Sequence, residues 1–339
     1  MNSTPKSMRA EILRGIRKTL LELGNATKVE LSEKLGISFP TISKFFSQME
    51  KDGELISVGL DDSSGGRRAK RYTYNPEYML GLAIFLERTE TNYIVFNCLG
   101  EIKNTGKTSS VLENDDLKSL TECVEEIKEK YPKISSISIG VPGSVNNGRI
   151  IYIPGYEHLQ NFDLKEYMEK RFSVPVVIEN DMNAAVLGYH DSNGRKKNNS
   201  LIYLYSGQNG PGAGIMVNGV VVRGSTNFSG EISFVPQYDD RNFGQALENE
   251  GKKVFVSHEY EIDAISRLIA SFVAIINPHK IIFCDDEVDQ MIIEKIVKQS
   301  SKYIPTEHLP ELLMSDWKQD YLFGLQRLGL DLMINEISR

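Results

Sequence analysis

The first 75 residues constrain the fold most, because helix signals, a tight turn and a basic glycine loop follow one another there in a fixed order. Apolar residues spaced three and four apart predict a first helix over 7–23. Thr27 stands three residues before Glu30, the capping-box arrangement that begins a second, short helix. Gly36 is free to take a positive φ and forms a turn before Ser38, the predicted N-cap of a third helix. We therefore predict a helix-turn-helix.

A basic loop between two predicted strands completes this region. Segments 55–58 and 71–74 read as strands, and the loop between them contains Ser63-Ser64-Gly65-Gly66-Arg67. Glycines let a backbone approach DNA closely, and arginines neutralise phosphates or enter a narrow minor groove. Basic loops, and sets of three helices with a glycine turn, also occur separately in proteins that bind no DNA. Together and in this order, they predict a DNA-binding winged helix. The expected contacts are Phe39, Pro40, Thr41, Lys44, Gln48, Arg67, Arg68, Lys70 and Arg71.

Charge divides the chain at the same place. Residues 1–76 carry 13 Lys and Arg against 9 Asp and Glu, a net charge of +4, whereas the remainder carries 26 against 37, a net charge of −11. At 339 residues, the chain suits a DNA-binding domain over 1–77 and a larger body over 78–339. The acidic body argues against nucleic-acid binding outside the first domain.

Composition disfavours membrane, secreted and disulfide-rich classes. No run of about 18 apolar residues is present, and the N-terminus lacks the apolar centre of a secretion signal. We therefore expect a cytoplasmic protein with no membrane contact. Cys98, Cys123 and Cys284 form no Cys-x-x-Cys pair, so we expect core thiols rather than a disulfide framework or a zinc ribbon.

The body has the pattern of an α/β protein. Three strand-like segments, 80–86, 92–97 and 101–109, precede a predicted helix over 114–131, and short apolar segments further along predict buried strands. Strands that alternate with helices favour two doubly wound lobes. The binding cleft of such a body lies where loops leave the C-terminal ends of strands.

Two loops at predicted strand ends offer ligand contacts. The loop 140–145 includes Gly143, which would let a ligand approach the backbone closely. The segment 179–185 brings Asn180 and Asp181 to the start of a helix, where they can bind sugar hydroxyls and Asp181 can accept a proton. The same residues are also common helix caps, so the local pattern leaves both interpretations open.

Two further loops are ambiguous when each is taken alone. The segment 210–214 is a glycine-dense turn that would suit the approach of a phosphate or a simple hairpin. Glu231, after Gly230, is either an acceptor for ligand hydroxyls or a surface acid. The order of these loops carries more information than any one of them.

In that order, the segments resemble the ROK family (repressors, open reading frames and kinases), in its repressor branch. The resemblance runs nearly end to end, and its most specific motif is Glu179-Asn180-Asp181-Met182-Asn183-Ala184-Ala185. It implies an actin-like, sugar-kinase-type body of two lobes, with a carbohydrate in the cleft. It also implies a homodimer or dimer of dimers whose winged helices read a palindromic operator. The polar set left for an effector comprises Gly143, Asn180, Asp181, Glu231 and Glu248.

The sequence departs from the kinases of this family. Those kinases open the body with an Asp and Gly-Gly-Thr-Lys for the ATP phosphates, whereas Ala83 stands at the Asp position here and 84–87 replaces the glycines. Asp285 and Asp286 replace the adenine-side Gly-Gly, and two acids would repel the nucleotide phosphates. We therefore expect no kinase activity, no catalytic residue and no cofactor.

The zinc site implied by the resemblance is also missing. Its histidine is Phe234 here, and its cysteines are absent from 235–248, so we expect no metal and a loop held by packing alone. Phe234 and Gly155 each replace a polar sugar contact of the family. The effector could therefore be a carbohydrate, or the cleft could have acquired another ligand.

These observations predict a transcriptional regulator, a repressor of carbohydrate-related genes with a catalytically inactive, effector-sensing body. Two alternatives stay open: an ATP-dependent sugar kinase with an accessory DNA-binding domain, and a constitutive DNA-binding protein whose pocket binds no effector. A ligand that closes the lobes would change the spacing of paired winged helices only if it binds the two states with different affinity.

Overall fold

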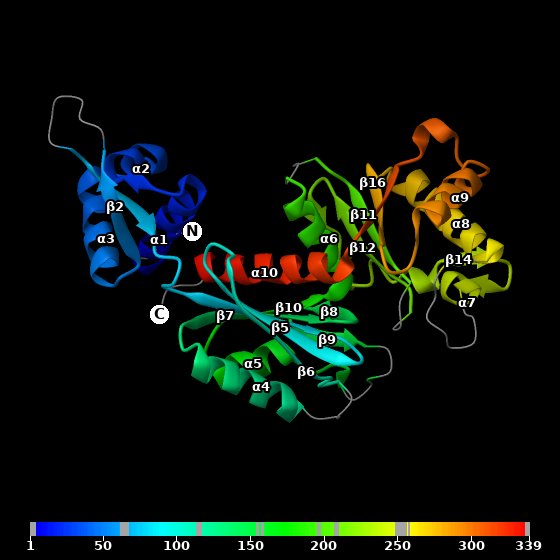
Figure 1. Cartoon of the computed structure of the whole chain (residues 1–339), viewed down its shortest axis with the longest axis horizontal. Helices are drawn as coiled ribbons and strands as arrows, with labels where there is room; N and C mark the ends of the chain where they lie inside the picture. The colour runs from blue at the N-terminus through cyan, green and yellow to red at the C-terminus, as the bar shows by residue number, and fades with distance from the viewer. Residues whose placement is uncertain are drawn as a thin grey trace.

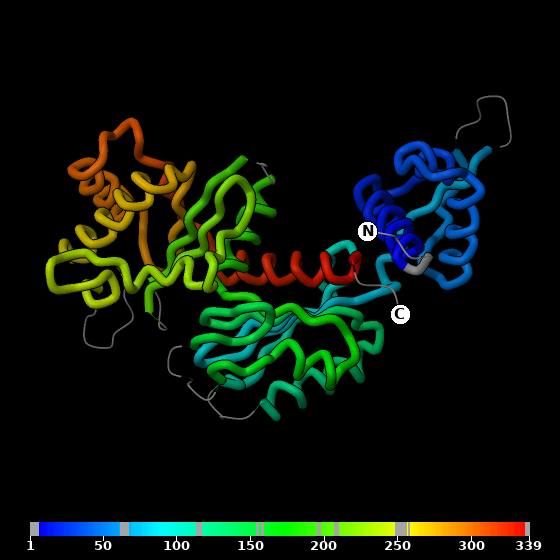
Figure 2. Tube along the Cα trace, turned by 180° about the vertical axis from the view of Figure 1, so that it is seen from behind, coloured from blue at the N-terminus to red at the C-terminus, as the bar shows by residue number. Residues whose placement is uncertain are grey.

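The computed structural model describes residues 5–61, 68–112, 117–153, 156, 159–194, 198–206, 210–247, 256 and 258–335. A small N-terminal domain, a first lobe and a second lobe follow one another along the chain (Figure 1). Helix α10 (Trp317–Asn335) lies in the middle of the molecule. Figure 2, from behind, agrees with Figure 1 that its C-terminal end lies beside the N-terminal domain.

The N-terminal domain has the winged helix-turn-helix arrangement. It consists of α1 (Pro5–Leu23), α2 (Lys28–Leu35), α3 (Phe39–Lys51) and a sheet in the order β1 (Ala26–Thr27), β3 (Lys70–Tyr74), β2 (Leu55–Leu60). The predicted capping box is confirmed, because the Glu30 amide donates to the Thr27 hydroxyl and the Thr27 amide donates to the Glu30 carboxylate. Gly36 ends α2 at φ 64°, as predicted. Ser38 precedes α3, but its hydroxyl pairs with that of Thr41 and makes no helix-cap hydrogen bond.

A buried ion pair lies in the core of this domain. Arg17 Nε donates to Glu54 Oε1 at 2.5 Å, and the Tyr74 hydroxyl donates to the same oxygen at 2.9 Å. Both charged side chains are only 4% exposed. The surrounding apolar core includes Ile16, Leu20, Leu31, Ile42, Phe46 and Met49.

The first lobe is built on a five-stranded mixed sheet. Its strands lie in the order β10 (Val176–Asn180), β7 (Ile134–Val141), β4 (Leu80–Leu86), β5 (Glu90–Asn97), β6 (Ile102–Ser109). The three consecutive strands β4, β5 and β6 pair antiparallel, whereas β7 and β10 continue the sheet in parallel. Helices α4 (Leu117–Lys130) and α5 (Leu164–Phe172) cover one face and α10 the other.

The second lobe repeats this strand order. Its sheet runs β13 (Val220–Val221), β12 (Gly212–Val217), β11 (Leu201–Tyr205), β16 (Lys280–Cys284), β17 (Glu311–Ser315), again with three antiparallel strands followed by two parallel ones. Helices α8 (Glu259–Ile275) and α9 (Gln290–Ser300) cover its outer face, and α6 (Asp181–Ser192) covers the inner one. The predicted α/β class is confirmed, with mixed sheets in both lobes.

Helices α6 and α10 pack closely between the two sheets. A Cβ atom on Gly188 would lie 1.8 Å from the Asp320 carbonyl oxygen. A Cβ atom on Gly324 would lie 1.8 Å from the Ala184 carbonyl oxygen, so the two helices approach each other closely at both glycines. Asp320 lies in the first turns of α10, where it is buried and accepts a hydrogen bond from the Tyr203 hydroxyl at 2.9 Å.

The C-terminal part of α10 contacts the N-terminal domain. Arg14 on α1 donates to the Asn335 carbonyl oxygen at 3.3 Å. Buried apolar residues of the N-terminal domain, α6 and α10 belong to one continuous cluster. The winged helix is therefore connected to the body through packed side chains as well as through the chain.

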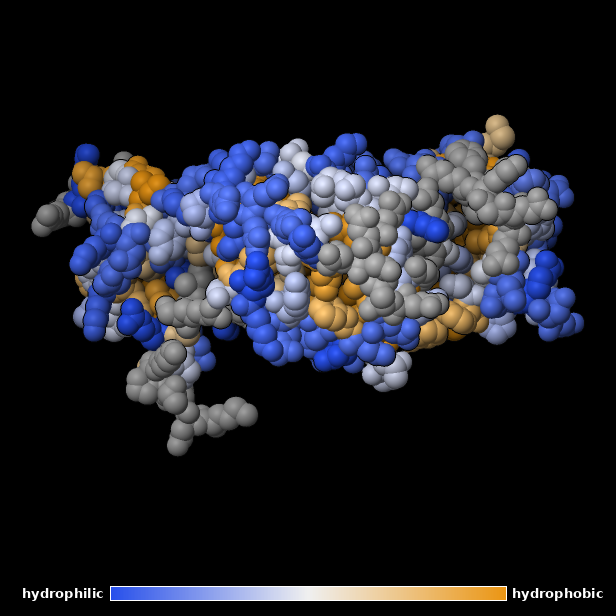
Figure 3. Space-filling view, turned by 90° about the horizontal axis from the view of Figure 1, so that it is seen from below, coloured by the Kyte–Doolittle hydropathy of each residue, from blue (hydrophilic) through white to orange (hydrophobic). Residues whose placement is uncertain are grey.

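The face shown in Figure 3 is mostly hydrophilic, with small, separate apolar patches. Within the described ranges, no helix is long and apolar enough to cross a membrane. Cys98 and Cys284 are buried, Cys123 is half-buried, and all three are free thiols, which agrees with the prediction of core thiols.

Candidate functional site

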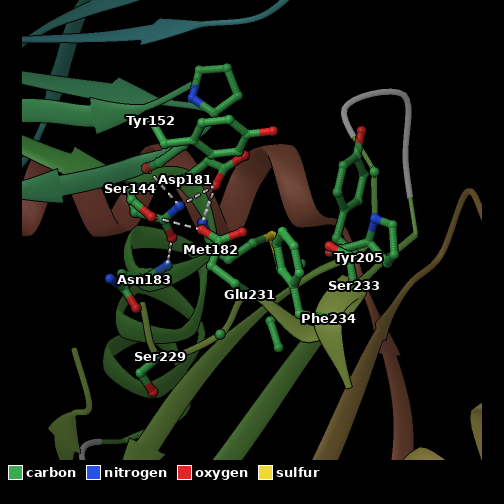
Figure 4. Close-up of a pocket in the computed structure, with 18 of the residues that line it drawn as sticks. Ser144, Tyr152, Asp181, Met182, Asn183, Tyr205, Ser229, Glu231, Ser233 and Phe234 are labelled. Carbon is green, nitrogen blue, oxygen red and sulfur yellow. Dashed lines mark hydrogen bonds between the residues drawn. The ribbon is translucent and has the colours of Figure 1, made fainter. Parts of the chain in front are cut away.

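A cavity of about 270 Å³ lies between the two lobes, at the N-terminal end of α6 (Figure 4). Residues of both lobes line it, among them Gly143, Ser144 and Tyr152 from the first lobe, Asn180, Asp181 and Asn183 around the start of α6, and Tyr205, Ser229, Glu231 and Phe234 from the second lobe. Ser144 lies in the predicted loop 140–145 but was not named as a contact, and Tyr152, Tyr205 and Ser229 were missed because no local motif distinguishes them.

Asn180 is both a helix cap and a part of the cavity wall. Its side-chain oxygen accepts from the Asn183 amide at 2.9 Å. Its Nδ2 donates to the Gly143 carbonyl at 3.0 Å and to Asp181 Oδ1 at 2.9 Å. Asn180 therefore fixes the first-lobe loop against the start of α6 and orients the neighbouring carboxyl group.

The Asp181 carboxyl group keeps one oxygen for a ligand. Oδ1 accepts from Asn180 and from the Met182 amide, the latter at 2.8 Å, whereas no hydrogen bond of the described residues reaches Oδ2. Burial raises the pKa of Asp181, the hydrogen bond from the Met182 amide lowers it, and the charge of Glu231 raises it; the net result is a pKa of about 7. Near neutral pH this carboxyl group is partly protonated, so it can accept or donate a hydrogen bond.

Glu231 faces the same cavity from the second lobe. Burial raises its pKa, while the hydrogen bond that its Oε1 accepts from the Ser144 hydroxyl at 2.9 Å acts in the opposite direction. This bond joins the two lobes. A second contact also joins the lobes, because Arg223 of the second lobe pairs with the buried Glu179 of the first lobe. Sequence analysis missed both contacts, because their partners lie 87 and 44 residues apart.

Several of the predicted loop glycines serve packing. Gly140 and Val141 lie in β7, and a Cβ atom on Gly140 would lie 2.0 Å from the Tyr321 hydroxyl. Gly143 lines the cavity, but a Cβ atom there would lie 2.1 Å from the Tyr152 carbonyl oxygen, so the adjacent hairpin requires glycine. These two glycines make room for neighbouring protein groups.

The glycine-dense segment 210–214 belongs to a hairpin, which is one of its two predicted interpretations. Gly212 and Gly214 lie in β12, which pairs antiparallel with the preceding strand β11. A Cβ atom on Gly214 would lie 2.0 Å from the Met182 carbonyl oxygen, so this glycine lets α6 approach the sheet. The cavity wall at this point is positioned by helix packing.

The segment predicted to be held by packing alone is held by polar contacts as well. It forms β14 (Pro236–Tyr238), β15 (Arg241–Asn242) and α7 (Phe243–Leu247). The Tyr238 hydroxyl donates to Asp263 at 2.9 Å, and the Arg267 guanidinium lies 4.9 Å from the centre of the Tyr238 ring. No group of His, Cys, Asp and Glu in the described segments could hold a metal ion. Glu248 lies outside the described residues.

The positions that differ from sugar kinases are apolar or acidic. Ala83 is fully buried in β4, between β5 and β7. Burial and the nearby carboxylates of Asp316 and Asp286 raise the pKa of Asp285. A nucleotide phosphate would meet an apolar strand interior on one side and acidic side chains on the other, and the neighbouring Lys318 is already paired with Glu87 at 3.3 Å.

The third helix of the N-terminal domain exposes the predicted DNA-contacting side. Phe39 is 48% exposed, Pro40, Lys44 and Gln48 are also exposed, and Thr41 is half-buried. The opposite side of α3 is buried through Ile42, Phe46 and Met49. The helix therefore presents a mixed polar and apolar surface, as base and backbone contacts require.

The basic residues of the wing have different environments. Arg67 lies outside the described residues, and Arg68 is exposed. Lys70 forms a partly exposed ion pair with Glu50, with Nζ 2.5 Å from Oε1. Arg68 is therefore the described wing residue most available to a phosphate.

Arg71 is engaged within the N-terminal domain. Its guanidinium lies 3.1 Å from carboxylate oxygens of both Glu30 and Asp61, and its Nε donates to Asn25 at 2.7 Å. These contacts tie β3 to the start of α2. A DNA phosphate would have to compete with two carboxylates, so Arg71 is better assigned to holding the domain together.

Comparisons with known proteins agree with the fold. Residues 82–245 match the model of the ROK family. A xylose repressor of Caldicellulosiruptor bescii is 28% identical over 226 residues, covering 64% of this chain and 56% of that protein. The DNA-binding transcriptional dual regulator NagC of Escherichia coli is 23% identical over 222 residues, covering 63% and 54%. The aligned part thus spans little more than half the length of these relatives.

A solved structure has the same fold over nearly the whole chain. The crystal structure of a ROK family transcriptional regulator, described as a homolog of E. coli MLC protein, superposes with a TM-score of 0.71 at 20% identity. It covers 96% of this chain and 98% of that one, so the likeness of fold extends over the N-terminal domain and both lobes of this chain. The family match thus covers the first lobe and most of the cleft, residues 82–245, and the solved structure has the same fold over nearly the whole chain.

Proposed function

We propose that this chain is a DNA-binding transcriptional regulator, a repressor of carbohydrate-related genes, whose cleft binds an effector and catalyses no reaction. One observation carries the proposal: α10 packs on α6, which starts at the polar cleft, and also contacts the winged helix. The names of the relatives, a xylose repressor and NagC, support the same assignment.

The N-terminal domain, over 1–77, is the proposed DNA-binding part, and 78–339 is the effector-binding and oligomerisation part. On α3, Lys44 and Gln48 are exposed at the side that would enter a major groove, and in the wing Arg68 is exposed. The proposed DNA contacts are Phe39, Pro40, Thr41, Lys44, Gln48, Arg67, Arg68 and Lys70. Arg71 is left out because two carboxylates hold it.

The cleft supplies the proposed effector contacts. Asp181 and Glu231 face one cavity from α6 and from the second lobe, and both are suited to bind hydroxyl groups of a sugar. Asn180 orients Asp181, and Gly143 forms part of the wall. Glu248 belongs to the proposed set on the resemblance alone.

An effector would act by changing how the lobes are held together. Ser144 and Glu231 bridge the lobes beside the cavity, so a ligand that binds Glu231 competes with or reinforces that bridge. A movement of α6 relative to the first lobe would be passed to α10 through the Gly188 and Gly324 contacts, and from α10 to α1. Regulation requires that the effector prefer one of the two arrangements.

Assembly as a homodimer or dimer of dimers would pair two winged helices about a twofold axis, and the operator would then be palindromic. Light scattering of the purified protein, free and with its DNA site, tests this part. A monomer on a non-palindromic site would contradict it.

Sugar kinase activity is the alternative function that the cleft suggests, because Asp181 could accept a proton from a sugar hydroxyl there. Ala83 offers no carboxylate, and the acids at Asp285 and Asp286 would repel ATP. Incubation with ATP and a panel of sugars should yield no sugar phosphate. ATP-dependent phosphorylation that disappears in Asp181→Asn would overturn the assignment.

The proposed function is tested first by incubating the purified protein with fragmented genomic DNA from its source and sequencing what it retains. We expect a palindromic site beside carbohydrate genes, and absence of enrichment would contradict DNA binding. Addition of candidate sugars should then change operator affinity and raise the melting temperature. Unchanged affinity and melting temperature throughout would favour a constitutive DNA-binding protein.

A further inference from the structure

Exposed aromatic rings continue the cleft beyond its polar base. Phe234 lines the cavity and is 55% exposed, and Phe228 beside it is 50% exposed, with the ring centres 5.2 Å apart. Tyr152 lines the cavity from the first lobe and is 41% exposed. We call these three side chains the aromatic rim. Exposed apolar groups that border a polar cavity are typical of ligand-binding surfaces.

The aromatic rim comes from both lobes. Figure 4 shows Tyr152 reaching toward the cavity from the first-lobe side and Phe234 from the second-lobe side, with the carboxyl groups of Asp181 and Glu231 between them. A flat group bound next to these carboxyl groups would therefore meet an aromatic face. Sugar rings present such flat C–H faces, and their edges carry hydroxyl groups.

The base of the cleft is rich in hydrogen-bond acceptors. Asp181 Oδ2 accepts no hydrogen bond from the described residues. Glu231 contributes a second carboxyl group. Buried acceptors left without donors are costly, so a ligand that supplies several O–H groups is favoured.

The same base disfavours a phosphate. The cavity-lining residues that the structure describes include two acids and no Lys, Arg or His. A phosphate group brings only acceptors at neutral pH and would face Asp181 and Glu231 in a site with restricted solvent. Charge and hydrogen-bonding capacity therefore select against phosphorylated ligands.

We propose that the cleft binds an unphosphorylated glycoside with at least two rings. The hydroxyl groups of the first ring bind Asp181 and Glu231, and the second ring lies on the aromatic rim, mainly on Phe234. This inference rests on the proposed function, because it names the chemical class of the effector. Phe234 is then the residue that distinguishes a glycoside from a free monosaccharide.

Isothermal titration calorimetry on the full chain tests this inference. The probes are glucose, xylose and N-acetylglucosamine, each as the free sugar, as a phosphate ester and as a phenyl glycoside, in which the phenyl group is a second flat ring. For any sugar that binds, we expect the phenyl glycoside to bind about five- to tenfold more tightly than the free sugar. The phosphate esters should give no measurable binding.

Variants of the aromatic rim separate stacking from general effects. Phe234→Ala should reduce the preference for the phenyl glycoside to less than about twofold, because it removes the ring that the phenyl group contacts. Tyr167→Ala is the matched control, since Tyr167 is also an exposed aromatic residue, 37% exposed, but lies on α5 outside the cavity lining. It should leave the preference unchanged. Melting temperatures of both variants establish that they are folded.

The outcomes distinguish this inference from the proposed function. Equal affinity for free sugars and phenyl glycosides, or an unchanged preference in Phe234→Ala, would overturn the two-ring inference while an effector site remained. A phosphate ester that binds more tightly than the free sugar would overturn the selection against phosphate. No binding by any probe would overturn the inference and remove sugar sensing from the proposed function, whereas the DNA-retention experiment stands independently.

Discussion

The N-terminal domain and the cleft both bury charged groups, but only the N-terminal domain balances them. Glu54 receives hydrogen bonds from Arg17 and Tyr74 inside the winged helix. Asp181 and Glu231 share a cavity with each other and with no cation among its described lining residues. A paired buried charge fixes local structure, whereas unpaired carboxyl groups weaken the fold and remain available to a ligand. The contrast separates a structural cluster from a binding site without reference to sequence motifs.

The largest expected effect comes from unpairing the buried cluster. Glu54→Gln would leave the Arg17 guanidinium buried without a counter-charge, and such a loss costs about 3 to 5 kcal/mol. We expect the N-terminal domain to unfold at lower urea concentration than the body. Hydrogen exchange of the α1 and α3 amides measures this directly.

The matched control for that variant is Glu50→Gln, which breaks the partly exposed pair with Lys70 in the same domain. Solvent screens that pair, so little change in urea stability is expected. If both variants had the same small effect, the Arg17 and Glu54 pair would not be a determinant of the domain's stability, and the contrast with the cleft would be lost.

The connection between the two regions can be broken at Gly324. Gly324→Val would force a side chain against the Ala184 carbonyl oxygen, because even a Cβ atom would lie 1.8 Å from it. Overpacking of this kind costs about 1 to 3 kcal/mol or more. We expect a lower melting temperature and, in the folded fraction, an altered response of operator affinity to the effector.

Gly15→Ala is the control for the helix-packing variant. Its nearest neighbour would be the flexible end of Leu35 at 3.3 Å, and alanine favours a helix over glycine by about 1 kcal/mol. Its melting temperature should not fall. Equal losses in both variants would indicate that any change in a helical glycine is harmful, and would remove the specific role of the α6–α10 contact.

The winged helix could be predicted largely from sequence because its signals are local. Thr27 and Glu30 are three residues apart, and Gly36 follows within the same short segment, so one helix cap and one turn fix the order of the elements. The strands of the first lobe were also predictable from consecutive apolar segments. In the cleft, the motif around Asp181 identified the start of α6, where Asn180 both caps the helix and lines the cavity.

The remainder of the cleft was not predictable because it depends on distant partners. Ser144 and Glu231 are brought together only when the two lobes pack. Glycine signals were misleading for a related reason, since close approach of a ligand and of a helix both require a missing side chain. Gly140 and Gly214 accommodate Tyr321 and Met182, and only tertiary structure distinguishes these neighbours from a ligand.

The unpaired carboxyl group predicts a pH dependence of stability. The folded-state pKa of Asp181 is raised from 3.8 to about 7, so between these values the folded chain keeps a proton that the unfolded chain has lost. Stability therefore falls as pH rises through this window, and the full penalty is present above about pH 7. Asp181→Asn removes the penalty while keeping an oxygen for the Met182 amide.

We expect Asp181→Asn to melt several degrees above the wild type at about pH 8 and to show no advantage at about pH 4. Differential scanning calorimetry across this range measures the difference. Asp240→Asn is the control, because the Asp240 side chain is 84% exposed and its substitution should give no pH-dependent change. An advantage of Asp181→Asn that did not vary with pH would mean that ionisation is not its source.

The smallest expected effect concerns the exposed basic residues of the winged helix. Solvent screens their charges, so replacing them should change DNA binding and leave the stability of the fold nearly unchanged. A phosphate contact releases counterions, so losing one lowers the slope of log affinity against log salt by about 1. Arg68→Ala and Lys44→Ala should each weaken operator binding and flatten that slope, as fluorescence anisotropy at several salt concentrations would measure. Lys298→Ala, exposed on α9, should change neither quantity. Because Arg71 is held by Glu30 and Asp61, Arg71→Ala should instead lower the melting temperature of the domain. If its melting temperature stayed unchanged and the salt slope of operator binding fell by about 1, Arg71 would be a phosphate contact, and the contrast between the two regions would be smaller.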